Sequence, residues 1–119
     1  MDISGKLQIK PGQSVVVLNA PPGLDLPGVR PAADAAAADA DVVLAFVTRA
    51  GDLSSAAQAI AAAQADRLAW ISYPKAGQLG TDLNRDRLVA ALSGRGVQPV
   101  RQISLDGTWS ALRFRPASS

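Results

Sequence analysis

Three short, almost wholly apolar runs stand out along the chain, at residues 15–18, 42–47 and 68–73. Each run is rich in β-branched or aromatic residues and is bounded by polar or turn-forming residues. A run of this length without polar alternation is typical of a strand that is buried on both faces. The pattern therefore predicts three parallel strands in the middle of a sheet.

A helical pattern fills the segment between the second and third runs, over residues 51–66. Asp52 is placed to cap its N-terminus, because a carboxylate can accept the free amides of the first turn. The small apolar residues that recur on one helical face are Leu53, Ala56, Ala57, Ile60 and Ala63. Strand, helix and strand in this order predict a βαβ unit whose alanine-rich helix lies close to the sheet.

A second helical pattern follows the third run and a loop that holds two glycines. Its apolar positions are Leu83, Leu88, Ala91 and Leu92. We expect Thr81 or Asp82 to cap its start. Ser93 and Gly94 are expected to end it, with the glycine in the left-handed conformation.

The last third of the chain predicts an antiparallel hairpin with strands at residues 97–105 and 108–115. Asp106-Gly107 between them is a strong signal for a tight two-residue turn. Strand alternation divides the second strand into one face with Ser110, Leu112 and Phe114 and another with Trp109, Ala111, Arg113 and Arg115.

Together these elements predict a single α/β domain over residues 1–119. The expected architecture is a three-layer, shortened Rossmann-like mixed sheet, with a parallel centre and a C-terminal antiparallel hairpin. A chain of 119 residues with 48% hydrophobic residues is long enough to bury a real core. Residues 21–40 carry the weakest pattern, which suggests a short edge strand at 28–30 and a helical turn at 32–38.

Composition removes whole classes of chemistry. The chain contains no cysteine and no histidine, and every acidic residue is an aspartate. Disulfides, Ser-His-Asp and Cys-His catalysis and zinc sites built on Cys or His are therefore excluded. The aspartates do not have the spacing of a calcium loop, so we expect no metal.

Charge and hydropathy indicate the compartment and the partners. The net charge of +2 is too small for a broad field that grips nucleic acid, although arginines outnumber acids in the last third. The N-terminus lacks the apolar core of a signal peptide, and no run approaches the length of a membrane helix. We expect a cytoplasmic protein with no membrane partner, and the small net charge argues against a nucleic-acid partner without removing that class.

Two resemblances rest on particular motifs. DVVLAFV, LAWISYPK and the Asp-Gly hairpin resemble the second half of a class I methyltransferase, a Rossmann-like fold that binds S-adenosylmethionine. VLNAPPG, PK…TDLNRD and WSALRFRP, which together span most of the chain, resemble a family of small bacterial proteins of unknown function. The glycine-rich loop of the methyltransferases is replaced here by residues 19–23, where two prolines remove backbone amides. We therefore expect no cofactor.

Ligands of open α/β sheets sit beyond the carboxyl ends of the strands. Three segments should converge there, at residues 19–23, 48–52 and 73–82. Lys75 follows Pro74 and could pair with a phosphate or carboxylate, or could be a solvated loop lysine. The candidate ligand-binding residues are Asn19, Gly23, Thr48, Tyr73, Lys75, Gly77, Gly80, Thr81, Asp82 and Arg85.

Several of these residues have a plain structural alternative. Asp82, Arg85 and Asp86 could form a charge set at the start of the second helix, with capping and local ion pairing as its role. Tyr73 could stack on a ligand or lie partly buried at a strand end. Asn19 could bind a ligand or join two loops.

The hairpin face with Trp109, Arg113 and Arg115 suggests a second candidate surface. It could pack within the domain, contact another subunit, or stack a nucleic-acid base. The sequence favours a non-catalytic domain that acts through self-association, as a homodimer, or through a protein partner. The alternative is a protein that binds a small anionic metabolite or nucleotide, or an atypical enzyme, through the strand-end loops.

Overall fold

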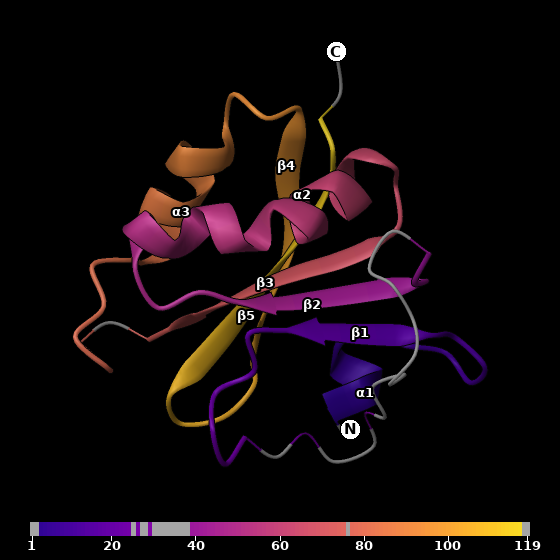
Figure 1. Cartoon of the computed structure of the whole chain (residues 1–119), viewed down its shortest axis with the longest axis horizontal. Coiled ribbons are helices and arrows are strands. Elements are labelled where there is room, and N and C mark those ends of the chain that lie inside the picture. Colours follow the sequence, from indigo (N-terminus) through magenta and orange to yellow (C-terminus); the bar gives the residue numbers. More distant parts are fainter. Residues whose placement is uncertain (1–2, 25, 27–28, 30–38, 76, 118–119) are drawn as a thin grey trace.

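A five-stranded mixed sheet forms the centre of the computed structural model, which describes residues 3–24, 26, 29, 39–75 and 77–117. Its strands are β1 (Val15–Leu18), β2 (Val42–Phe46), β3 (Leu68–Pro74), β4 (Val97–Ser104) and β5 (Trp109–Pro116). Their order across the sheet is β1-β2-β3-β5-β4 (Figure 1). β1, β2 and β3 run parallel, whereas β5 is antiparallel to both β3 and β4. The predicted α/β class and the mixed sheet are confirmed.

β1 corrects one expectation, because it lies at an edge of the sheet and not in its middle. Every residue of β2 is buried, as a strand covered on both faces requires. In β1 only Val15 is buried, and the other three residues are partly exposed. A continuous apolar run therefore identified the strand but not its place in the sheet.

Two helices cover one face of the sheet. The single helix predicted after β2 is a 3-10 helix, η1 (Ala50–Ala56), followed directly by α2 (Ala57–Gln64), and α3 (Arg85–Leu92) precedes β4. Figure 1 shows α2 and α3 beside each other above the strands. Their buried residues share one core with the sheet residues that face them, including Ile71, Leu112 and Phe114.

The face that α2 turns to the sheet differs from the predicted one by a small rotation. Ala59 and Ala62 are buried, whereas Ala57, which was predicted to be buried, is exposed. The change from 3-10 to α-helical geometry at this point alters the number of residues per turn, so a single 3.6-residue period does not describe the whole segment. Alanines nevertheless supply most of the contact, which allows the close approach expected from the sequence.

The helix ends also differ from prediction. Arg49, not Asp52, is the N-cap of η1, and Asn84, not Thr81 or Asp82, is the N-cap of α3. The Asn84 side chain accepts the Arg87 amide at 2.8 Å. The left-handed glycine after α3 is Gly96, with φ of 76°, and not Gly94.

The opposite face carries a shorter helix, α1 (Ile3–Lys6), which Figure 1 shows below the strands. Trp70 of β3 is fully buried there, and its indole Nε1 donates to the Leu7 carbonyl at 3.0 Å. Arg113 of β5 donates to the side-chain oxygen of Gln8. Two long-range hydrogen bonds therefore attach the segment that follows α1 to the middle of the sheet.

The hairpin turn is longer than predicted. The amides of both Leu105 and Asp106 donate to the Trp109 carbonyl, so the turn spans more than two residues. Gly107 does not take the positive φ that a type I′ turn requires. Instead, Oδ1 of Asp106 accepts the Thr108 and Trp109 amides, each at 2.8 Å. The turn is thus stabilised by hydrogen bonds to the Asp106 side chain, and not by a positive φ at Gly107 as expected.

Replacing Asp106 with alanine is expected to lower the free energy of unfolding by about 1–2 kcal/mol, because two amides lose a charged acceptor. Chemical denaturation measures this change. Asp86→Ala is the matched control, since the Asp86 side chain is 94% exposed and its one ion pair with a described residue is with neighbouring Arg85, at 3.6 Å. The control should have a smaller effect, below about 1 kcal/mol, from the lost carboxylate in the first turn of α3 and its exposed ion pair. Equal effects of the two substitutions would contradict the role given to Asp106.

The edge strand suggested at residues 28–30 and the helical turn at 32–38 fall mainly outside the described residues. Val29, which is described, is not part of a strand. No helix within the described ranges is long and apolar enough to span a membrane.

Candidate functional site

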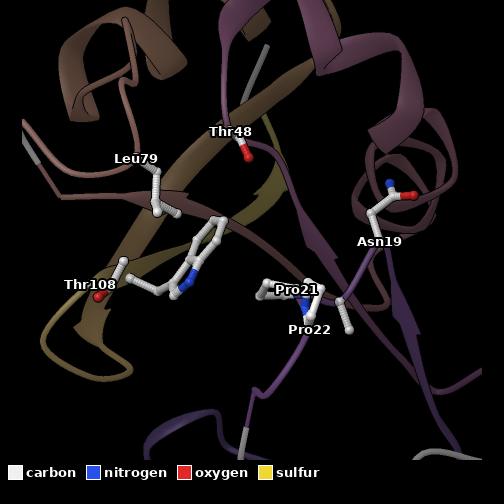
Figure 2. A pocket seen from close by; sticks show the side chains of 8 residues that line it. Asn19, Pro21, Pro22, Thr48, Leu79 and Thr108 are labelled. Carbon is white, nitrogen blue, oxygen red and sulfur yellow. The ribbon is translucent and has the colours of Figure 1, made fainter.

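A pocket of about 760 Å³ opens at the carboxyl ends of the parallel strands. Asn19 to Pro22 follow β1, Thr48 follows β2 and Leu79 belongs to the loop after β3. All three segments predicted to converge contribute to it. Thr108 and Trp109 at the turn of the hairpin complete the lining, and Figure 2 shows Thr48, Leu79, Thr108 and the two prolines around the same space.

The floor of the pocket is apolar. Trp109 is 5% exposed and meets Phe46 edge to face, with ring centroids 5.1 Å apart and planes at 85°. Such an arrangement is favourable beyond the area that it buries, and it holds the indole in one orientation. Pro21 and Pro22 add two rings with restricted backbone, and Leu79 is 55% exposed although it is a large apolar residue. An exposed leucine beside a pocket offers apolar surface to a ligand.

Polar groups with unused hydrogen-bonding capacity surround this floor. The hydroxyls of Thr48 and Thr108 make no hydrogen bond to any described residue, and neither does Nε1 of Trp109. The buried side-chain atoms without a partner in the described part of the chain are Ser72 Oγ and Arg113 Nε. Because Trp109 Nε1 is not one of them, the small exposed part of this residue includes its N–H. Thr48, Thr108 and Trp109 therefore line the pocket with side-chain groups that form no hydrogen bond to the described residues.

Asn19 forms the side of the pocket next to η1. It takes a positive φ of 59°, and its side-chain amide donates to the Ser55 carbonyl at 3.4 Å. Figure 2 shows this side chain turned away from Leu79 and Thr108. Asn19 thus joins two loops, as one of the two sequence interpretations proposed, while its backbone still borders the pocket.

Hydrogen bonds connect the loops that carry the pocket. Thr81 Oγ1 donates to the Thr48 carbonyl, and the Asp82 carboxylate accepts the Ala50 amide at 2.8 Å. These contacts join the segment after β2 to the loop after β3. Thr81 and Asp82 therefore support the wall of the pocket without lining it. The charge set proposed for Asp82, Arg85 and Asp86 is not formed as predicted, because Asp82 precedes α3 and Arg85 pairs with Asp86.

Lys75 lies beside the hairpin and not within the pocket. Its Nζ donates to Ser104 Oγ at 2.8 Å, and its backbone amide donates to the Thr108 carbonyl at the same distance. The lysine therefore helps to fix the turn that positions Thr108. Its ammonium has no ion pair within the described part of the chain.

The remaining candidates lie around the site. Tyr73 is 3% exposed and packs in the core shared with α2 and α3. Burial raises the pKa of its hydroxyl, and nearby Arg85 opposes this shift. Gly23 and Gly77 are exposed and take positive φ values of 76° and 80°.

Gly80 is constrained by an arginine that the sequence did not single out. Its φ is 65°, and a Cβ built there would lie 3.3 Å from an Nη atom of Arg49. The Arg49 guanidinium thus rests against the loop that carries Leu79. Arg49 makes no side-chain hydrogen bond or ion pair within the described ranges, so its charge is available at the margin of the pocket.

The three residues proposed as an interface do not form one exposed patch. Trp109 is buried, Arg113 is half-buried against Gln8, and Arg115 forms an ion pair with Asp66 at 3.1 Å. Contact with a second subunit or a protein partner through this face stays a prediction.

Sequence reasoning missed Thr108 and Trp109 as pocket residues. These two residues reach the pocket because β5 pairs with β3 in a register that sets Trp109 opposite Pro74. This register places the hairpin turn beside the loop after β3. Predicting it required the knowledge that β5, and not β4, lies next to β3.

The pocket is lined by neutral side chains. The described residues that line the pocket include no aspartate, lysine, arginine or tyrosine. Within the described part of the chain, no group of three or more acidic side chains could hold a metal ion. No family model, no curated protein and no solved structure matches this chain.

Proposed function

We propose that this protein is a non-catalytic α/β domain that binds a small, largely apolar molecule in the pocket at the carboxyl ends of β1, β2 and β3. The observation that carries the proposal is the set of unused donors around an apolar floor. Trp109, Thr48 and Thr108 each retain a hydrogen-bonding group, while Pro21, Pro22 and Leu79 supply apolar surface. Pockets that bind small molecules commonly combine apolar walls with a few placed polar groups.

Binding fits the lining better than catalysis does. General acid–base chemistry needs a titratable group within hydrogen-bond reach of the reacting atom. The groups that line this pocket are two hydroxyls, an amide and an indole, none of which exchanges a proton near neutral pH without an activating base. The ligand should instead offer hydrogen-bond acceptors to the indole N–H and the two hydroxyls.

The sheet supports a relationship to Rossmann-like folds as a further part of this proposal. Three parallel strands followed by an antiparallel pair, with β5 next to β3, are compatible with a shortened Rossmann-like arrangement. The pocket also lies at the end of the sheet where ligands bind in such folds. Uncharged aromatic fragments are the first ligands to test in a pocket with this lining, and S-adenosylmethionine and nucleotides then test the comparison with Rossmann-like folds.

The test uses the two tryptophans as probe and internal control. In an ¹⁵N-labelled sample, the indole N–H of Trp109 reports on the pocket, whereas that of Trp70 is buried and bonded to Leu7. A ligand in the pocket should shift the Trp109 signal and leave the Trp70 signal in place. Equal shifts of both signals, or no shift with any fragment or nucleotide, would contradict the proposal.

A substitution then tests the polar wall. Thr48→Val keeps the shape of the side chain and removes the hydroxyl, so it should weaken binding by about 2- to 10-fold, as expected for one lost hydrogen bond. Ser93→Ala provides the control, because the Ser93 hydroxyl bonds to the Ala90 carbonyl at the end of α3, outside the pocket. If Thr48→Val and Ser93→Ala change the affinity equally, the hydroxyl of Thr48 does not contact the ligand.

A further inference from the structure

Two arginines lie directly opposite each other on the outer pair of strands. The register of β4 and β5 pairs Arg101 with Arg113, immediately after an irregularity between Pro99 and Arg101. Directly opposed residues on neighbouring strands project from the same face, with Cβ atoms about 4.5–5.5 Å apart. Arg115 follows on the same face and pairs in register with Gln98.

Neither arginine of this pair forms an ion pair within the described residues, although Asp66 lies close enough to act on Arg113. The Asp66 carboxylate is engaged by Arg115, at 3.1 Å and 3.4 Å. Arg113 does form one side-chain hydrogen bond, to Gln8 in the segment that follows α1. The Gln8 side chain is a neutral amide, so this bond does not neutralise the guanidinium. Like charges that face each other across two strands are destabilising unless something neutralises them.

Arg113 is held in place for such a role. It is half-buried, and the contact with Gln8 fixes one Nη atom, while its Nε is buried without a partner. Partial burial lowers the pKa of Arg113, and the charges of Arg115 and Arg101 lower it further, against the opposing effect of Asp66. An arginine always remains charged in a protein. The unfavourable environment of Arg113 therefore lowers the stability of the folded state and does not remove the charge.

We infer that Arg101 and Arg113 together form a site for an oxyanion, and specifically for a phosphate group. Guanidinium groups bind phosphate through paired, charge-assisted hydrogen bonds, and two of them can share one anion. Arg101 is exposed and free to close on the anion, whereas Arg113 is already positioned.

The site is separate from the pocket described above. Trp109, at the pocket, pairs with Pro74, whereas Arg113 pairs with Trp70 at the other end of β3. Four residues of extended strand separate these positions by roughly 13 Å. A phosphate at the arginine pair would therefore not contact a ligand at Trp109.

The experiment compares thermal unfolding in sodium chloride and in sodium phosphate at equal ionic strength. Phosphate at about ten times its dissociation constant should raise Tm by about 5 °C. Arg101→Gln should have two effects of opposite sign. It should raise Tm in chloride, because the repulsion is removed, and it should abolish the additional stabilisation by phosphate.

Arg95→Gln is the matched control. Arg95 is an exposed arginine in the turn between α3 and β4, and its side chain makes no hydrogen bond or ion pair to any described residue. This variant should respond to phosphate as the wild type does. The inference is overturned if Arg101→Gln retains the full phosphate response, if Arg95→Gln loses it equally, or if phosphate stabilises no more than chloride.

A second measurement reports on Arg113 without altering it. The Nε–H resonance of Arg113 should move on titration with inorganic phosphate in the wild type and stay in place in Arg101→Gln. Phenyl phosphate in the same titration distinguishes the source of the anion. Tighter binding of the ester indicates a phosphorylated molecule, and tighter binding of inorganic phosphate indicates the free ion. A resonance that responds to neither compound overturns the inference.

Discussion

Trp70→Ala is expected to lower the free energy of unfolding by about 3–5 kcal/mol, among the largest effects of any single substitution in this chain. Trp70 is fully buried in the core beneath α1, and Leu44 and Arg113 flank it on the neighbouring strands. Removing the indole creates a cavity and leaves the Leu7 carbonyl without its donor. Urea denaturation followed by circular dichroism measures the change.

Trp70→Phe separates the two contributions. Phenylalanine keeps much of the apolar volume but cannot donate to Leu7, so the loss should be smaller, at about 1–2 kcal/mol. It also leaves Trp109 as the single tryptophan, whose fluorescence should retain its native position. If Trp70→Ala unfolds no more easily than Trp70→Phe, the packing beneath α1 does not stabilise the domain.

Leu88→Ala should cost about 2–5 kcal/mol, the second large effect. Leu88 is fully buried where α3 meets the sheet, in the core that also contains Ile71, Leu112 and Phe114. The cavity would lie between helix and sheet, where rigid strand residues limit relaxation. Denaturation with urea is again the measurement, with the m-value as a check that unfolding stays two-state.

The next residue of the same helix provides the control. Val89 is only partly buried and packs at the margin of this core, so Val89→Ala should cost about 1 kcal/mol or less. The effects of the two substitutions on helix propensity differ by less than about 0.7 kcal/mol. The difference expected from burial is larger. Equal losses at the two positions would contradict the placement of α3.

Much of the fold could be predicted from local pattern. The runs at residues 15–18, 42–47 and 68–73 lie within one residue of the observed strands. A strand buried on both faces must be apolar along its whole length, as β2 is, although β1 has the same pattern at an edge of the sheet. The faces of β5 were also predicted correctly, since Leu112 and Phe114 belong to one core and Trp109 and Ala111 to the other. Period-two alternation fixes faces without any knowledge of the partners.

The errors at caps and turns arose where an aspartate side chain accepts backbone amides other than those that the pattern assigned to it. Asp82 has the residue type of a helix cap for α3, but its carboxylate accepts the amide of Ala50, the first residue of η1, which lies far away in the sequence. Asp106-Gly107 has the composition of a two-residue turn, but the Asp106 side chain accepts two amides and selects a longer one. The contact of Asp82 lies outside any rule based on neighbouring residues, whereas the contacts of Asp106 are local and compete with the backbone turn.

The sequence predicted the part of the candidate site that follows the parallel strands, but not the part that the hairpin contributes. The carboxyl ends of parallel strands must lie at one end of the sheet, so Asn19, Thr48 and the loop that contains Leu79 could be brought together from sequence. The contribution of Trp109 depends on β5 lying between β3 and β4, an order that hydrophobic pattern does not encode.

The position of β5 also has a consequence for how the chain is made. β5 pairs with β3 along six residues and covers its second edge, yet it follows β1, β2, β3 and β4 in the sequence. A ribosome therefore completes three apolar parallel strands before it synthesises the strand that closes them. Until β5 arrives, the nascent chain carries an open strand edge at β3, the kind of surface that other chains pair with and that chaperones protect during synthesis.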